Sequence, residues 1–299
     1  MDRQQLKNLL EAAPFFLLVA LARTLPRVPA LKLGRLLGRY SRFILLGRRR
    51  LAADNLRQAY PDKDEEWIKQ RVKLVFEHLG ISAMEMLRID QFDAKQDIER
   101  YFTFEGLEHL QQLKQNNTGA FILSGHIGFW EVGTFFMPQM GYNIDFVAKT
   151  IRNPYVDNFF RRQREAAGGK CIDSRHGARR IIRSLNEGRI VCVLLDQHVS
   201  KKRAVVVNFF DRPAFATPII AQIAMRGNTP VVPVFVYRNP DFSYRVVVEE
   251  PVYLENSTDD DAIVAHTQRL TDILENAVRR QPDQWFWVHK RWRRSAMRQ

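Results

Sequence analysis

A histidine and a glutamate five positions apart, His126 and Glu131, are the two side chains of this sequence best placed to do chemistry. An imidazole held by a carboxylate through one ring nitrogen keeps the other nitrogen as a base near neutral pH. Residues five apart point about 140° away from each other on a regular helix, so a turn has to bring them together. Gly125 and Gly128 make such a turn accessible. The spacing therefore favours proton transfer by His126, with Glu131 as the carboxylate that orients it.

The elements predicted around this pair would present it at a ligand site. Residues 121–123 form a short apolar run that stops at two small residues, as a buried strand does. His126 then lies at the carboxyl end of that strand, where open α/β sheets bind their ligands. Glu131 falls in the first turn of a helix predicted over 129–137, where a carboxylate is favoured. The simpler alternative is a satisfied core histidine beside a solvated glutamate.

Arg161 and Arg164 are candidate substrate-binding residues. They lie one turn apart on a helix predicted over 154–167. Their guanidinium groups could hold a phosphate or an oxyanion. The alternative is a solvated helix face that binds nothing.

Asp196 and Gln197 are a second candidate pair. They follow an apolar run over 189–195 and so lie, like His126, at the carboxyl end of a predicted strand. A contact with the acceptor or with the catalytic residues is one interpretation. A plain turn that ends the strand is the other.

Motifs of several other enzyme classes are absent from the sequence. It contains no Gly-x-Ser-x-Gly elbow, no phosphate-binding glycine–lysine loop, no dinucleotide fingerprint and no His-Glu-x-x-His. Its two cysteines, Cys171 and Cys192, form neither a disulfide framework nor a metal-binding spacing and are interpreted as structural thiols in a reducing compartment. We expect no metal and no other cofactor.

The net charge of +13 is located at the two ends of the chain. Residues 1–58 carry 12 basic and 3 acidic side chains, residues 289–299 carry 5 basic and none acidic, and the 230 residues between them carry 29 basic and 30 acidic. This distribution favours docking to an anionic membrane surface or an acidic partner over a basic groove for nucleic acid. The aromatic and basic residues over 284–294 suit either a lipid headgroup interface or single-stranded nucleic acid.

The first 60 residues are predicted to be helical and to associate with a membrane. The apolar run over 12–22 is shorter than the roughly 20 residues that a spanning helix needs. Residues 31–46 form an amphipathic pattern with a basic residue every three or four positions, which is typical of a helix in a membrane interface. A basic helix packed on the protein body is the compatible alternative.

Beyond residue 61, strand-like and helix-like segments alternate up to a last helix over 262–280. Such alternation predicts an α/β fold with a mostly parallel central sheet flanked by helices. No repeat or low-complexity linker interrupts it. We therefore expect two parts, a membrane-associating segment over 1–60 and a catalytic domain over 61–299. The aromatic pair at 209–210 is predicted to line a substrate pocket or to pack in the core.

With its accompanying blocks, the His-x-x-x-x-Glu motif resembles the lipid A biosynthesis acyltransferases of the lauroyl and myristoyl type, over nearly the whole chain. The blocks are Arg48-Arg-Arg50 with Asn55, Asn153-Pro154 with Asp157 and Arg164, Asp196-Gln197, Phe209-Phe-Asp-Arg-Pro213 and Gln281-Pro-Asp-Gln-Trp-Phe-Trp-Val-His289. The histidine motif is shared with the glycerol-phosphate acyltransferases, whose Phe-Pro-Glu-Gly block is missing here. The resemblance implies a glycerol-phosphate-acyltransferase-like fold.

The resemblance also implies an activity. A fatty acyl chain would pass from acyl carrier protein, or from coenzyme A, to a hydroxyl of a glycolipid precursor at the cytoplasmic face of the inner membrane. His126 would act as the base, Glu131 would orient it, and Arg164 would stabilise an oxyanion or a lipid phosphate. No metal and no covalent intermediate would be required.

Two other functions remain open at this point. One is acyl transfer to a different lipid, such as a phosphatidylinositol mannoside or a lyso-phospholipid. The other is a non-catalytic protein that binds membranes or nucleic acid through its basic ends.

Overall fold

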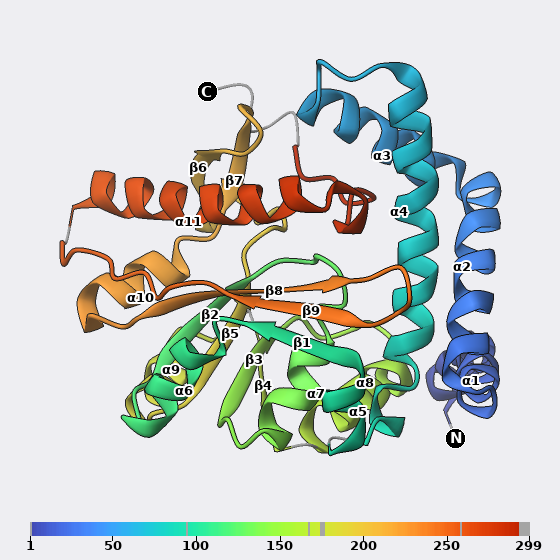
Figure 1. Ribbon diagram of the computed structural model, residues 1–299, viewed down its shortest axis with the longest axis horizontal. Coiled ribbons are helices and arrows are strands. Elements are labelled where there is room, and N and C mark those ends of the chain that lie inside the picture. Colours follow the sequence, from blue (N-terminus) through green and yellow to red (C-terminus); the bar gives the residue numbers. More distant parts are fainter. Residues whose placement is uncertain (1, 94, 167, 174–176, 258, 293–299) are drawn as a thin grey trace.

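A seven-stranded sheet forms the centre of the computed structural model, which describes residues 2–292 except 94, 167, 174–176 and 258 (Figure 1). Its strands are β1 (Phe102–Glu105), β2 (Ala120–Ser124), β3 (Ile144–Ala148), β4 (Lys170–Asp173), β5 (Ile190–Leu194), β8 (Val231–Arg238) and β9 (Tyr244–Val248). Their order is β1-β9-β8-β2-β5-β3-β4. The strands from β8 to β4 in that order run parallel, whereas β9 is antiparallel to β8 and parallel to β1. The predicted mostly parallel sheet is confirmed.

The central strand β2 is buried on both faces, which explains its unbroken apolar sequence. Because side chains alternate along a strand, Phe121 and Leu123 enter one hydrophobic cluster and Ala120 and Ile122 enter another. The first cluster also takes in α10 (Ile219–Gly227) and α11 (Asp260–Arg280), and the second takes in α6 (Leu107–Gln115) and α7 (Val132–Gln139). Helices thus cover both faces of the sheet (Figure 1).

Seven further helices complete the described part of the chain. They are α1 (Arg3–Thr24), α2 (Arg27–Ile44), α3 (Leu46–Ala59), α4 (Glu65–Met86), α5 (Gln96–Tyr101), α8 (Pro154–Ala166) and α9 (Ala178–Asn186), with the short 3-10 turns η1 (Ile89–Gln91), η2 (Lys201–Arg203) and η3 (Pro282–Gln284). A separate two-stranded sheet is formed by β6 (Val205–Asn208) and β7 (Pro213–Ala216), which pair antiparallel.

Three glycines let α2 and α4 pack with their backbones in contact (Figure 1). A Cβ on Gly38 would lie 2.1 Å from the Phe76 carbonyl oxygen, and one on Gly80 would lie 2.1 Å from the Gly34 oxygen. Small residues at such a crossing allow helices to approach closely. The N-terminal helices are therefore packed tightly onto the helix that adjoins the sheet.

Helix α1 is longer than the apolar run that marks it in the sequence. Its 22 residues make it the one described helix that is long and apolar enough to cross a membrane by length and composition. The expectation that this segment is too short to span is therefore wrong, because polar residues before the run extend the helix. Phe15 of α1 packs against Phe159 of α8, with ring centroids 5.3 Å apart.

The aromatic residues near the C-terminus are part of the core. Trp285 and Trp287 are fully buried and contact each other edge to face. Phe209 and Phe210 are buried against them. The prediction that these tryptophans bind lipid headgroups or nucleic acid is wrong, because their rings are not exposed to solvent. Residues 293–294 of the same stretch lie outside the described part of the chain.

Candidate active site

The carboxyl ends of the neighbouring strands β2 and β5 bring His126 and Asp196 together. Ser124 pairs with Leu194 in the parallel register, so the residues two positions beyond each strand meet at the same edge. Asp196 Oδ1 lies 2.8 Å from His126 Nδ1, and Asp196 Oδ2 accepts a 2.7 Å hydrogen bond from the His126 backbone N–H. A single buried carboxylate therefore holds both the ring and the backbone of His126.

Asp196 is ionised and fixes the tautomer of His126. Burial favours the neutral acid, but the charge and hydrogen bonds of His126, together with the Trp285 Nε1–H donor at 2.8 Å, lower the pKa of Asp196 to about 2. An ionised carboxylate accepts a hydrogen bond from Nδ1–H, and the neutral ring then keeps its lone pair on Nε2. Gln197 Nε2 donates to that nitrogen at 3.0 Å. The side-chain amide of Gln197 thus occupies the hydrogen-bonding position at Nε2.

Asp196 also favours the protonated form of the His126 ring. Burial disfavours the charged imidazole, but the charge and hydrogen bond of Asp196 outweigh this and raise the pKa of His126, with a smaller contribution from Glu131. The ring contacts Trp130 and Phe286, with centroids 5.1 and 5.9 Å away, and its side chain keeps 18% exposure. The His126 side chain is therefore held in place and still partly exposed.

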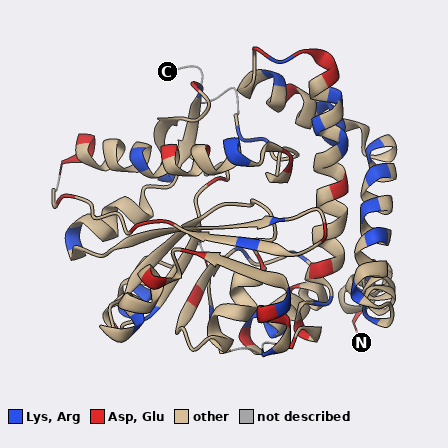
Figure 2. Cartoon of the chain, viewed as in Figure 1, with Lys and Arg blue, Asp and Glu red and all other residues tan. Residues whose placement is uncertain are grey.

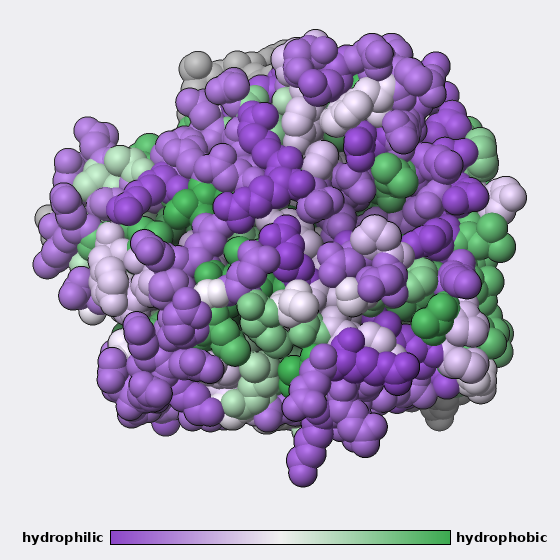
Figure 3. All heavy atoms as spheres, in the orientation of Figure 1, coloured by the Kyte–Doolittle hydropathy of each residue, from purple (hydrophilic) through white to green (hydrophobic). Residues whose placement is uncertain are grey.

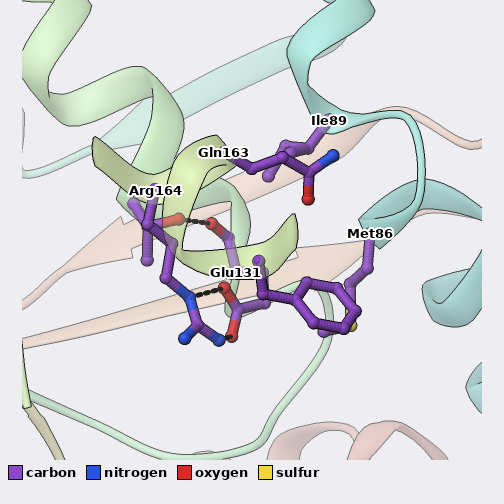
Figure 4. A pocket seen from close by; sticks show the side chains of 7 residues that line it. Met86, Ile89, Glu131, Gln163 and Arg164 are labelled. Atoms are coloured by element: carbon purple, nitrogen blue, oxygen red, sulfur yellow. Dashed lines mark hydrogen bonds and ion pairs between the residues drawn. The ribbon is translucent and has the colours of Figure 1, made fainter. Parts of the chain in front are cut away.

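Glu131 forms an ion pair with Arg164 rather than the expected hydrogen bond with His126. The carboxylate accepts from Arg164 Nη2 at 2.7 Å and from Nε at 3.0 Å (Figure 4). Glu131 is the residue before α7, and Arg164 comes from α8. The difference follows from strand order, because β5 places Asp196 directly beside the ring.

Arg161, the other arginine expected at the site, lies farther out. Its Nη2 pairs with Asp157 Oδ2 at 2.8 Å, one helical turn earlier on α8, and its side chain is 53% exposed. Of the predicted site residues, the structure thus brings His126, Asp196 and Gln197 into contact, joins Glu131 to Arg164, and leaves Arg161 on the neighbouring surface.

Two glycines let the turn that carries His126 pack closely against neighbouring elements. Gly128 has a φ of +58°, and a Cβ there would lie 1.6 Å from the Val236 carbonyl oxygen. A Cβ on Gly125 would lie 2.6 Å from Leu274 Cδ1 and 3.3 Å from Asp196 Oδ2. Both glycines are required because the turn is pressed against β8 and α11.

A buried network absent from the sequence prediction supports the same turn. His78 of α4 donates from Nε2 to the Gly128 carbonyl at 3.0 Å and accepts at Nδ1 from Arg238 Nη1 at 2.7 Å. Burial and the charge of Arg238 hold the pKa of His78 well below its ordinary value. Glu85, about two turns further along α4, accepts from Arg238 Nη2. No local sequence pattern marks this network, because α4 carries polar residues along much of its length.

The described residues contain no group of three or more His, Cys, Asp or Glu side chains that could hold a metal ion. Burial raises the pKa of Cys192 to about 12, which keeps that thiol protonated and unreactive.

The fold and this arrangement define an α/β protein with a carboxylate-bound histidine at the carboxyl edge of its sheet. The sequence model described as bacterial lipid A biosynthesis acyltransferase matches residues 4–294, so the chain belongs to that family and is an acyltransferase of lipid A biosynthesis. This excludes the alternative of a protein that binds without catalysis.

Curated relatives and one solved structure show similarity at low identity. The lipid A biosynthesis palmitoleoyltransferase of Escherichia coli is 24% identical over 87% of this chain and 84% of its own. The myristoyltransferase of the same organism is 25% identical over 87% and 78%, and the lauroyltransferase 23% identical over 90% and 87%. The 1-acyl-sn-glycerophosphate acyltransferase of Thermotoga maritima covers 86% of this chain and 99% of its own, at 15% identity and a TM-score of 0.40.

Proposed function

We propose that this enzyme transfers a fatty acyl chain from a thioester, carried by acyl carrier protein or coenzyme A, to a hydroxyl of a lipid A precursor, with His126 as the general base. The observation that carries the proposal is the hydrogen bond that Asp196 accepts from His126 Nδ1, which leaves Nε2, now bonded by the Gln197 amide, as the basic nitrogen of the ring.

The reaction proceeds by direct transfer. The acceptor hydroxyl displaces the Gln197 amide from His126 Nε2 and gives its proton to that nitrogen as the oxygen attacks the thioester carbonyl. The tetrahedral intermediate collapses to the ester and expels the thiolate, which takes the proton back from the imidazolium. Asp196 stabilises the imidazolium in between.

Glu131 and Arg164 act together beside this centre. Glu131 fixes the Arg164 guanidinium through two hydrogen bonds and contributes negative charge near His126. Arg164 is the cation assigned to the oxyanion or to a lipid phosphate. The small cavity that they share with Met86, Ile89 and Phe160 has about 10 Å³, roughly the space of one water, so an acyl chain requires side-chain movement to enter there (Figure 4).

The membrane partner is assigned to the outer faces of α1 and α2. Leu17 is 72% exposed and Ile44 is 80% exposed, and apolar atoms gather along this edge of the molecule (Figure 3). Basic residues follow the length of α2 (Figure 2). Exposed apolar side chains next to basic ones bind anionic lipid surfaces. These exposed faces support the proposal that the enzyme works at the cytoplasmic face of the inner membrane, where it would meet its glycolipid acceptor.

The test is an acyl-transfer assay with purified enzyme, a tetra-acylated lipid A precursor, and acyl carrier protein thioesters or acyl coenzyme A of several chain lengths. A penta-acylated product with one donor class, and a loss of about 10²–10⁴-fold in the His126→Ala variant, is the expected result. Equal product from the variant would exclude His126 as the base. Lyso-phospholipid and phosphatidylinositol mannoside acceptors test the alternative substrates.

A further inference from the structure

A polar cavity lies at the same sheet edge as His126, two strands away. It has a volume of about 190 Å³ and is bordered by the carboxyl ends of β3 and β4 and by α8 and α9. In the order β2-β5-β3-β4, neighbouring strands are about 4.8 Å apart, which puts β3 roughly 10 Å from the strand that carries His126. Ligands of open α/β sheets bind along this edge. The cavity therefore continues the catalytic edge.

Arg164 connects the cavity to the catalytic centre. Its side chain lines the cavity and at the same time holds Glu131 by two hydrogen bonds. Arg161, one turn earlier on α8, also lines the cavity. A molecule bound in the cavity thus touches the residue that borders the reacting groups.

The lining suits a phosphorylated sugar. Lys149, after β3, and Arg180, on α9, add two cations to Arg161 and Arg164, and neither has a carboxylate within ion-pair distance in the described part of the chain. Cations of this kind bind phosphate oxygens. On the measure by which the cavity beside Glu131 has the space of one water, this cavity has the space of roughly 13–19, which leaves room for a sugar ring.

Carboxylates share the lining with these cations. Asp157, Glu165 and Asp173 border the cavity, and Asp157 is paired with Arg161. Carboxylate oxygens accept hydrogen bonds from sugar hydroxyls. A purely phosphate-binding site would not need them, and the pantetheine arm of a thioester donor offers few hydroxyls for them to bind.

We propose that this cavity binds the phosphorylated sugar of the acceptor glycolipid and so selects which hydroxyl reaches His126. The inference rests on the proposed function and adds to it the part of the enzyme that recognises the acceptor. The fatty chains of the acceptor would remain on the membrane side, toward α1.

The experiment compares steady-state kinetics of the Lys149→Gln/Arg180→Gln double variant with the wild type, each assayed with a phosphorylated lipid A precursor and with its dephosphorylated form. Arg183→Gln is the matched control, because Arg183 lies on α9 like Arg180 but is 83% exposed, pairs with Glu187 and does not line the cavity. In the double variant we expect the KM for the phosphorylated acceptor to rise roughly tenfold to a hundredfold, as for loss of charge-assisted hydrogen bonds. Its kcat, the donor KM and the KM for the dephosphorylated acceptor should stay within about twofold of wild type.

Three results would contradict the inference. An unchanged acceptor KM in the double variant would show that the cavity does not bind the acceptor. A raised donor KM instead would assign the cavity to the phosphate of the thioester donor. A wild-type enzyme that transfers no acyl group would overturn the proposed function and this inference with it, whereas the first two results leave the proposed function standing.

Discussion

At the scale of single residues, the two carboxylates of the site have different roles. Asp196 holds the base, and Glu131 holds the cation that adjoins it. The division follows from geometry, since Asp196 meets the ring across adjacent strands while Glu131 begins the next helix and faces α8. The two residues should therefore respond differently to loss of their charge.

The Glu131→Gln substitution leaves the Arg164 guanidinium largely buried without its carboxylate. We expect the free energy of unfolding to fall by about 3 kcal/mol, the low end of the range for breaking a buried ion pair, because the two side chains keep 13% and 18% exposure. Urea unfolding measures this. Glu187→Gln, which breaks the exposed pair with Arg183, is the control and should leave the unfolding midpoint nearly unchanged. Equal midpoints for the two variants would contradict a structural ion pair at Glu131.

At the scale of elements, the strand-to-helix turn after β2 is the part of the fold that tolerates substitution least. Gly128 adopts a left-handed conformation and touches Val236, and its carbonyl accepts from His78. The contacts of Gly128 with β8 and α4 thus fix where the backbone places the His126 ring.

The Gly128→Ala substitution should move this turn. A Cβ 1.6 Å from a carbonyl oxygen forces the backbone to shift, and displacement of a catalytic group by about 1 Å costs roughly 10²-fold in kcat. Gly133→Ala is the matched control in α7, where a Cβ meets nothing within 4 Å and activity should be retained. Initial-rate assays decide the matter, and similar rates for the two variants would contradict the role of the turn.

The pattern of the sequence was sufficient to predict most of these elements and the position of His126 at a strand end. Continuous apolar runs gave β2 and β5, and both were followed by the residues that now face each other. The sequence could not show that β5 lies next to β2, because β3 and β4 come between them in the chain. For the same reason it assigned the orienting bond to Glu131, the nearest carboxylate in sequence, rather than to Asp196.

His78 and the C-terminal tryptophans escaped prediction for another reason. His78 lies 50 residues before Gly128 on a helix whose other buried residues are mostly apolar, so no local pattern marks it as a support of the turn. Trp285 and Trp287 lie in a stretch of aromatic and basic residues that resembles an interface segment, but tertiary packing buries both. Burial and long-range pairing are properties of the assembled fold.

At the scale of the whole molecule, exposed apolar side chains gather on one side, along α1 and α2. Asn55 of α3 donates to the carbonyl oxygens of Trp287 and His289, so the N-terminal helices are joined to the segment beside Asp196. The division of the chain at residue 60 stays a prediction. The helices that we assign to the membrane are thus part of the same packed structure as the site.

Replacing Leu17 and Ile44 together by serine should weaken membrane binding. Each side chain contributes about 1.5–3 kcal/mol when moved from water into an apolar phase, so partitioning onto vesicles with anionic lipid should fall at least about 10²-fold. Vesicle sedimentation measures the effect. Tyr253→Ser is the control, because Tyr253 is 53% exposed but lies outside α1 and α2. Unchanged binding of the double variant would show that this edge is not the membrane-binding surface.

The central claim, that Asp196 makes His126 the base of acyl transfer, is tested most directly by the pH dependence of kcat/KM. Asp196 raises the pKa of His126 against the opposing effect of burial, so activity in the wild type should rise with pH as His126 loses its proton. In Asp196→Asn the acid limb should move to lower pH and the plateau should fall, while Glu131→Gln should move the limb less, in the same direction. An acid limb that stays in place in Asp196→Asn, or that moves farther in Glu131→Gln, would contradict the account.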